Sequence, residues 1–245
     1  MITIDTPQGS IEWITARLWR LTGSELKSNI TATGTLSTSK AAMKSIDKLI
    51  AGIDLANEIN RNRDKIDQMD EWQLKRFMSH YNGDSFSGSI HTERGTDCEP
   101  DAIAAMSEII GTQIQDVGMC VMGDNINGVV ACSPDGLVWE GGRLIAGAEM
   151  KSPCLFNYYN HVSEGELPDD YKLQVHSGMA ICEVDTWHFG SYFAGKPLFH
   201  IPVKREKFTD ILAASLISFR EVYQDRFAKL KESMERLGLN ERSLL

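Results

Sequence analysis

Asp135, Glu149 and Lys151 lie in one short segment, "ACSPDGLVWEGGRLIAGAEMKSP", at 131–153. Side chains alternate across a strand, so Glu149 and Lys151 are predicted to share one face, with the carbonyl of Met150 within reach. A hairpin that turns at "EGG" would bring Asp135 beside Glu149. Two carboxylates this close repel each other unless one holds a proton or a cation lies between them.

Such a pair of carboxylates favours a hard cation, and Mg²⁺ is typically bound by one or two carboxylates together with substrate phosphate and water. Lys151 could orient or deprotonate a water, or offset the charge that gathers on phosphorus. The pattern therefore predicts metal-assisted hydrolysis of a phosphodiester. Taken singly, Glu-x-Lys is also typical of a surface pair, and Pro-Asp-Gly of a turn. However, the strand "LIAGAEM" is small and apolar, which predicts an interior strand where an unpaired acid is costly.

The remaining chain supplies the elements that would position this hairpin. Hydrophobic periodicity and turn signals predict helices over 13–30 with a break at Thr22-Gly23, and over 40–79, 96–111, 169–182 and 208–237. They predict strands over 116–122, 128–133, 137–139, 144–151, 187–194 and 199–204. We expect a single α/β domain over 1–245, with a central mixed sheet flanked by helices and a C-terminal amphipathic helix.

Composition limits the class of protein. The chain has 245 residues and a net charge of −9, which disfavours a protein that coats nucleic acid non-specifically. A local basic groove or a carboxylate metal site remains compatible with this charge. No apolar run approaches the length of a membrane span, and the start carries no secretory signal. A cytoplasmic protein without membrane contact is expected.

The five cysteines are spread along the chain, at Cys98, Cys120, Cys132, Cys154 and Cys182. Their odd number and wide spacing argue against a disulfide framework. No Cys-x-x-Cys pair occurs, so a zinc or iron–sulfur site would need ligands from distant segments. Reduced, mostly buried thiols are therefore predicted.

Five motifs occur in order along the chain: "ITARLWRLTGSEL" at 14–26, "GTDCEPDA" at 95–102, Ser-Pro-Asp-Gly at 133–136, Glu-x-Lys-Ser-Pro at 149–153, and "YKLQV" at 171–175 before an aromatic strand. Together they resemble the lambda-exonuclease and YqaJ-type viral recombinase nucleases of the PD-(D/E)xK superfamily. The resemblance covers 14–30 and 96–192, a little under half of the chain. Segment 31–94 has no counterpart and is expected to be a helical insertion.

The resemblance implies a restriction-endonuclease-like PD-(D/E)xK core and a nuclease that depends on Mg²⁺, with Mn²⁺ as a substitute. Asp135, Glu149 and the carbonyl of Met150 would bind the metal, and Glu99 would complete a second metal position. Lys151 would position or activate the attacking water. Gln174 would help to hold the water or the lysine.

Three further residues, Arg17, Ser24 and Ser133, match positions that bind a terminal 5′ phosphate in this family. An arginine fork with two hydroxyls suits a phosphate group. Structural alternatives stay open for the less specific positions: Glu99 as a first-turn acid, Gln174 as a helix surface residue and Arg17 as an ordinary helix cation. His176, near Gln174, is expected to be a structural histidine.

The implied activity is 5′–3′ degradation of one strand at double-stranded DNA ends, with 5′-phosphomonoester products. The remaining 3′ strands would pass to a single-strand annealing recombinase in phage or prophage recombination. The family also implies a homotrimeric toroid around DNA. A related endonuclease, a single-strand exonuclease and a catalytically silent DNA-binding protein are the alternatives.

Overall fold

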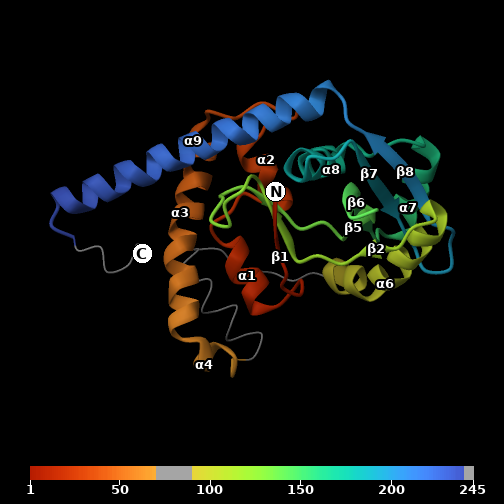
Figure 1. Cartoon of the computed structure of the whole chain (residues 1–245), viewed down its shortest axis with the longest axis horizontal. Helices are drawn as coiled ribbons and strands as arrows, with labels where there is room; N and C mark the ends of the chain where they lie inside the picture. The colour runs from red at the N-terminus through yellow and green to blue at the C-terminus, as the bar shows by residue number, and fades with distance from the viewer. Residues whose placement is uncertain (70–89, 240–245) are drawn as a thin grey trace.

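The computed structural model describes residues 1–69 and 90–239, except for the side chains of Ser24 and of residues 90–97. Its centre is a five-stranded mixed sheet in the order β2-β5-β6-β7-β8 (Figure 1). The strands are β2 (Ile114–Gln115), β5 (Gly136–Glu140), β6 (Arg143–Lys151), β7 (Thr186–Ser191) and β8 (Phe199–Lys204). Only the β6–β7 pair is parallel within this sheet. The expected mixed sheet is therefore confirmed.

The β5–β6 hairpin turns at the predicted place. Gly141 and Gly142 both have positive φ, 56° and 80°, which glycine adopts without the steric cost of a side chain. Gly136 lies opposite Ala148 across the hairpin, so the residue before Gly136 comes beside Glu149. This register sets the geometry of the acidic pair.

A second, three-stranded sheet has the order β1-β3-β4. Its strands are β1 (Ile2–Ile4), β3 (Met119–Val121) and β4 (Ala131–Cys132). The strands predicted over 116–122 and 128–133 lie here but are shorter than expected. The prediction had no strand at the start of the chain, whereas β1 pairs with β3 along its whole length.

Helices cover both faces of the five-stranded sheet. The helices of the described residues are α1 (Ile11–Arg17), η1 (Gly23–Glu25), α2 (Leu26–Asn29), α3 (Lys40–Arg61), α4 (Arg63–Ile66), α6 (Ile90–Ile110), α7 (Leu155–Glu164), α8 (Asp169–Cys182) and α9 (Lys207–Arg236). Packing of α6 against β6 forms one small core, whereas α8 packs against β6 and β7 within the main core. None of the helices in the described residues is long and apolar enough to span a membrane.

The helix predictions are confirmed for α8 and, within one residue at each end, for α9. The first half of α9 packs on α8 through buried Leu212, Leu216 and Phe219. Farther along, α9 passes across α3 (Figure 1). There Arg226 of α9 forms an ion pair of 2.6 Å with Asp47 of α3. Helix α7 was missed by the sequence prediction. The predicted helix over 40–79 corresponds to α3 and α4 up to residue 66, and its part from 70 onward lies outside the described residues.

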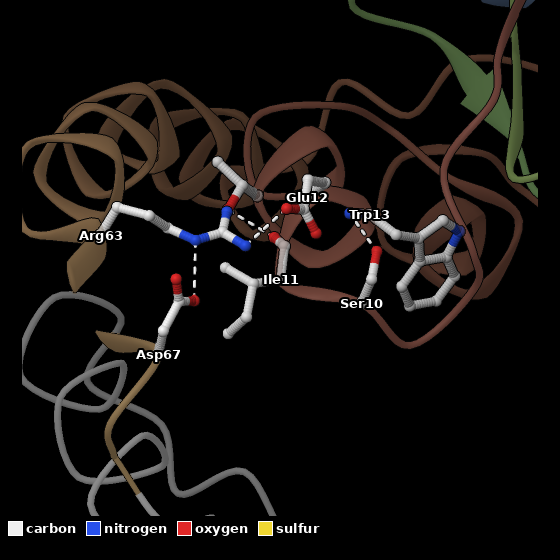
Figure 2. Close-up of polar contacts among 7 residues, drawn as sticks. Ser10, Ile11, Glu12, Trp13, Arg63 and Asp67 are labelled. Carbon is white, nitrogen blue, oxygen red and sulfur yellow. Dashed lines mark hydrogen bonds and ion pairs between the residues drawn. The ribbon is translucent and has the colours of Figure 1, made fainter. Parts of the chain in front are cut away.

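Local polar contacts fix the N-terminal helices (Figure 2). The hydroxyl of Ser10 caps α1 by accepting from the backbone N–H of Trp13 at 3.2 Å. Arg63 of α4 donates to Glu12 at 2.5 Å and to Asp67 at 2.8 Å, which joins α4 to the start of α1. By contrast Thr22, at the predicted break between helices, is the N-cap of η1 but makes no capping bond through its side chain.

Close packing brings α8 onto β6. An added Cβ at Gly147 of β6 or at Gly178 of α8 would approach the ring of Trp187 to 2.4 Å and 2.5 Å. Both glycines therefore leave room for the indole between helix and sheet. His176, also on α8, is buried and its Nδ1 lies 2.7 Å from the Thr209 hydroxyl, in agreement with a structural histidine.

Arg20 is expected to be a stabilising residue without a part in the chemistry. It is 3% exposed and donates to three carbonyls, those of Ala16, Gly128 (2.9 Å) and Ile126 (2.6 Å). Arg20→Ala should lower the free energy of unfolding by roughly 3 kcal/mol, because bonds from a charged donor would be lost inside the protein. Urea unfolding measures this, with Arg143→Ala on the exposed start of β6 as a control that should change little. An equal effect in both variants would contradict the assignment.

Candidate active site

The end of the β5–β6 hairpin holds the predicted acidic pair. The backbone N–H of Asp135 donates to the carbonyl of Ala148 at 3.1 Å. In return, the backbone N–H of Met150 donates to Oδ2 of Asp135. These two bonds fix the carboxylate of Asp135 at the edge of β6, next to Glu149 and to the Met150 backbone.

Glu149 is the centre of the cluster and is only 3% exposed. Its Oε1 accepts from Nζ of Lys151, two residues along the same face of β6, as strand alternation predicted. The same oxygen accepts from Nε2 of Gln174 at 2.5 Å. Because Gln174 lies on α8, this contact joins the helix to the acidic strand. The structure therefore brings Asp135, Glu149, Lys151 and Gln174 together.

The cluster has more carboxylate groups than the single ammonium group of Lys151 can neutralise. Burial and then the negative charge of Glu149 raise the pKa of Asp135 well above its usual range, although Lys151 and the Met150 N–H oppose the rise. Burial lowers the pKa of Lys151, but Glu149 and Asp135 outweigh it, and the net pKa lies above its usual value. Lys151 is therefore an ammonium group at neutral pH in the protein without a bound cation.

Glu99, on α6, lies near the cluster without joining it. Burial raises its pKa, and the charges of Asp116 and Glu149 raise it further. Yet the carboxylate oxygens of Glu99, Asp135 and Glu149 do not all lie within 4.8 Å of one another. Among the described residues, only a group of three cysteines meets this distance. The predicted second metal position is thus a looser arrangement than the pair of Asp135 and Glu149.

The predicted phosphate-binding residues meet on the other side of Glu149. Nη1 of Arg17 donates to the Ser133 hydroxyl at 3.4 Å, and Nη2 donates to the Thr22 hydroxyl at 3.2 Å. The guanidinium carbon lies 4.2 Å from the ring centroid of Trp13, whose Nε1 donates to Ser133 at 3.1 Å. The backbone of Ser24 lies in η1, but its side chain lies outside the described residues, so its predicted contact is not visible.

A small pocket of about 60 Å³ joins the two groups. Its lining consists of Arg17, Gly23, Cys132, Ser133, Pro134, Glu149, Gln174, Gly178 and Trp187. Burial lowers the pKa of Arg17, while the charges of Glu25 and Glu149 oppose that fall. The pocket thus holds a cationic fork and a hydroxyl beside the buried acid.

Sequence reasoning missed three side chains at this site. The Thr22 hydroxyl and the Trp13 ring both contact Arg17. The ring of Tyr171 lies 5.3 Å from Nζ of Lys151. Tyr171 stood inside the "YKLQV" motif and Thr22 inside "RLTGSEL", so both could have been found by asking which neighbours orient the cations.

Comparison with known proteins agrees with this arrangement. Residues 12–185 match the family described as the YqaJ-like viral recombinase domain. The chain belongs to this family. The predicted resemblance is confirmed, and the matched range includes the whole of segment 31–94. A sequence search of curated proteins gives no significant match.

Solved structures show the same fold. The YqaJ-like chain matches the crystal structure of an alkaline exonuclease, LHK-Exo, from Laribacter hongkongensis with a TM-score of 0.65 and 19% identity. The match covers 93% of this chain and 100% of that chain. The structure of LHK-Exo in complex with dAMP matches with the same values. At this identity the similarity establishes the fold, and the fold prediction is confirmed.

Proposed function

We propose that the protein is a divalent-metal-dependent exonuclease that degrades one strand of double-stranded DNA from its 5′ end. The observation that carries this proposal is the single pocket in which Glu149 and Gln174 meet Arg17 and Ser133. Acidic oxygens suited to a cation therefore lie next to donors suited to a phosphate. Membership of a viral recombinase family supports the same activity.

The donor set fits a hard divalent cation. Asp135, Glu149 and the carbonyl of Met150 supply oxygen ligands, and their arrangement suits Mg²⁺, with Mn²⁺ as a substitute. The raised pKa of Asp135 supports the same view, since burial and then the Glu149 charge destabilise its ionised form. When bound, such an ion would supply Lewis-acid activation of the phosphodiester and of a water.

The side chains of the protein would orient the attacking water, stabilise charge and hold one another in position. The Lys151 ammonium would orient the attacking water and offset the negative charge that grows on the phosphoryl oxygens. Gln174 would hold Glu149 in place through the 2.5 Å bond to Oε1. Tyr171 would restrict the position of Lys151 through the ring lying beneath the ammonium group.

The phosphate side of the pocket supports cleavage at an end. Its volume of about 60 Å³ suits a compact anion. Arg17 and Ser133 would bind the terminal 5′ phosphate, and Ser24 would add a second hydroxyl. A terminal phosphate held here would place the first phosphodiester toward Asp135 and Lys151.

The larger assembly is part of the same proposal. A chain with a net charge of −9 would gain little from general attraction to DNA, so staying on the substrate would benefit from encirclement by a homotrimeric ring. The 3′ single strands left behind would be the substrate of a single-strand annealing recombinase. The products would be 5′-phosphomonoesters.

Digestion of a linear duplex labelled at either the 5′ or the 3′ end tests the proposal. With Mg²⁺, the 5′ label should appear first as mononucleotide, while the 3′ label should stay in long fragments. EDTA should stop both. Release of the 3′ label first would overturn the polarity. Cleavage of a covalently closed circle would indicate an endonuclease, and degradation restricted to single strands would indicate a single-strand exonuclease.

Removal of the cationic fork should change phosphate selectivity. Arg17→Lys is expected to reduce kcat/KM on a 5′-phosphorylated duplex by roughly ten- to a hundredfold, because a charged bidentate donor contributes about 1.5–3 kcal/mol. On a 5′-hydroxyl duplex, kcat/KM of the same variant should fall much less. The ratio of the two rates is the measurement. An equal fall on both substrates would show that Arg17 supports the fold of the pocket and does not select the phosphate.

A further inference from the structure

Three of the five cysteines meet at one point next to the small pocket that Arg17 and Ser133 line, called the phosphate pocket below because of its proposed ligand. They are Cys120 of β3, Cys132 of β4 and Cys182, the last residue of α8. Their sulfur atoms all lie within 4.8 Å of one another, and the Cys132–Cys182 distance is 3.9 Å. All three side chains are between 0% and 5% exposed. Cys98 and Cys154, by contrast, are half-buried and lie apart from this cluster.

The fold creates this convergence by two separate contacts. Cys120 and Cys132 are directly opposite each other in the β3–β4 pair, so their side chains share one face. Helix α8 packs across β3 and β4 and delivers Cys182 from its C-terminal end. Segments that are distant in sequence thus supply one thiol each to a site closed to solvent.

The thiols also affect one another's protonation. Hydrogen bonds from Cys132 and Cys182 lower the pKa of Cys120, against the opposing effect of burial, and the N-terminal ammonium group lowers it further. Hydrogen bonds to Cys120, together with burial, raise the pKa of Cys132 and Cys182. Cys120 alone is therefore favoured as a thiolate before a metal ion binds. A thiolate is the form of cysteine that binds metal ions.

The sulfur separations suit a metal ion of the soft type. At the usual Zn–S bond of about 2.3 Å, sulfur atoms lie about 3.8 Å apart around a tetrahedral ion and about 4.0 Å apart around a planar three-coordinate ion. The Cys132–Cys182 distance already has this value, and the other pairs need to close by less than about 1 Å. Thiolates select ions such as Zn²⁺ and Cu⁺ over Mg²⁺ and Mn²⁺.

We propose that Cys120, Cys132 and Cys182 form a binding site for a soft, thiophilic metal ion, Zn²⁺ or Cu⁺, distinct from the carboxylate site. No fourth Cys, His, Asp or Glu joins this group among the residues described, so the ion is three-coordinate or takes one non-protein ligand. The site ties β3, β4 and α8 together. Cys132 also lines the phosphate pocket beside Ser133. A bound ion therefore holds in place the backbone that positions Ser133 for its contact with Arg17.

The test uses the full chain after chelator treatment and phosphine reduction. Zn²⁺ is titrated against a chromophoric chelator, and Cu⁺ in a second series. We expect one thiolate-bound ion per chain, counted from the thiolate charge-transfer band. Cys182→Ala and Cys120→Ser should weaken binding by more than about a hundredfold, since loss of even an outer-shell partner costs roughly ten- to a hundredfold. The matched controls Cys98→Ser and Cys154→Ser should keep both affinity and band, and Asp135→Asn, which alters only the carboxylate site, should keep the band.

A measurement on the unaltered protein covers the case in which a cluster variant does not fold. X-ray absorption of the Zn²⁺-loaded and Cu⁺-loaded wild-type protein should give a shell of three sulfurs at about 2.3 Å. A shell of only nitrogen or oxygen would overturn the proposal, as would the absence of stoichiometric binding of either ion. Equal loss in the Cys98 or Cys154 variants would also overturn it. None of these outcomes depends on DNA cleavage, so the proposed nuclease activity is tested separately.

Discussion

Replacement of Lys151 by alanine is expected to slow DNA cleavage strongly and to leave DNA binding intact. The ammonium group donates to the buried Glu149 and is the cation of the acidic cluster, so it is poised to stabilise charge that appears only during reaction. Loss of one such donor costs roughly a hundred- to a thousandfold in rate. Nucleotide release from a linear duplex measures the rate, and fluorescence anisotropy with labelled DNA in Ca²⁺ measures binding.

The control for this variant is Lys172→Ala on the following helix. Nζ of Lys172 lies 4.7 Å from the ring centroid of Phe208 and is not part of the acidic cluster. This variant should cleave at close to the wild-type rate. If Lys151→Ala also cleaved at that rate, Lys151 would have no part in the mechanism. If it lost DNA binding in parallel with cleavage, its role would be in binding the substrate.

Asp135→Asn is expected to have two opposite effects. Cleavage should fall by roughly two to three orders of magnitude, because a charged oxygen ligand and the local field it supplies are lost. The protein in EDTA, however, should become more stable at neutral pH. Burial and then the charge of Glu149 raise the pKa of Asp135, so its ionised form costs free energy in the folded state, and asparagine removes that cost. The amide oxygen can still accept from the Met150 N–H.

The sign of the pH dependence follows from the raised pKa. The free-energy cost of ionised Asp135 in the folded state has its full value above the folded pKa of this residue. It decreases as the pH falls through that pKa, and it is absent below the ordinary carboxyl pKa of the unfolded chain, about 3.9. The difference in Tm between variant and wild type should therefore shrink as the pH falls. Each kcal/mol corresponds to about 2–4 °C in a chain of this size. Thermal unfolding in EDTA at several pH values measures this difference in Tm.

A divalent cation should make the wild type more stable than Asp135→Asn, the reverse of their order of Tm in EDTA. Mg²⁺ should raise the Tm of the wild type, since it binds the folded state, and should have little effect on Asp135→Asn. A variant that is less stable than the wild type in EDTA at neutral pH would contradict the electrostatic account of the cluster. So would an equal Mg²⁺ shift in both proteins.

The site could be predicted where short-range geometry decides it. Strand alternation predicted that Glu149 and Lys151 share a face, and the double glycine predicted the turn that brings Asp135 back to them. Helix α8 and strand β8 were predicted at their observed bounds because each has turn signals at both ends. The contact from Gln174 came from the resemblance and not from periodicity, since nothing local indicates which residue of α8 faces β6.

The missed features depend on long-range packing. Strand β1 is three residues long, and its pairing with β3 leaves no periodic signal in the sequence. Helix α7 carries exposed apolar residues, with Phe156 at 71%, so its hydrophobic pattern does not mark a buried face. The cysteines were expected to be reduced, mostly buried thiols, and burial is confirmed for Cys120, Cys132 and Cys182. Their convergence required the β3–β4 register and the end of α8, neither of which their spacing reveals.

The central claim is that Asp135 and Glu149 hold a divalent cation beside Lys151, and Mn²⁺ binding followed by electron paramagnetic resonance tests it most directly. The soft thiol cluster does not compete for this ion. The account predicts stoichiometric Mn²⁺ binding by the wild-type chain, displacement by Mg²⁺, and loss of binding in the Asp135→Asn, Glu149→Gln double variant. Undiminished Mn²⁺ binding in the double variant, or none in the wild type, would contradict it.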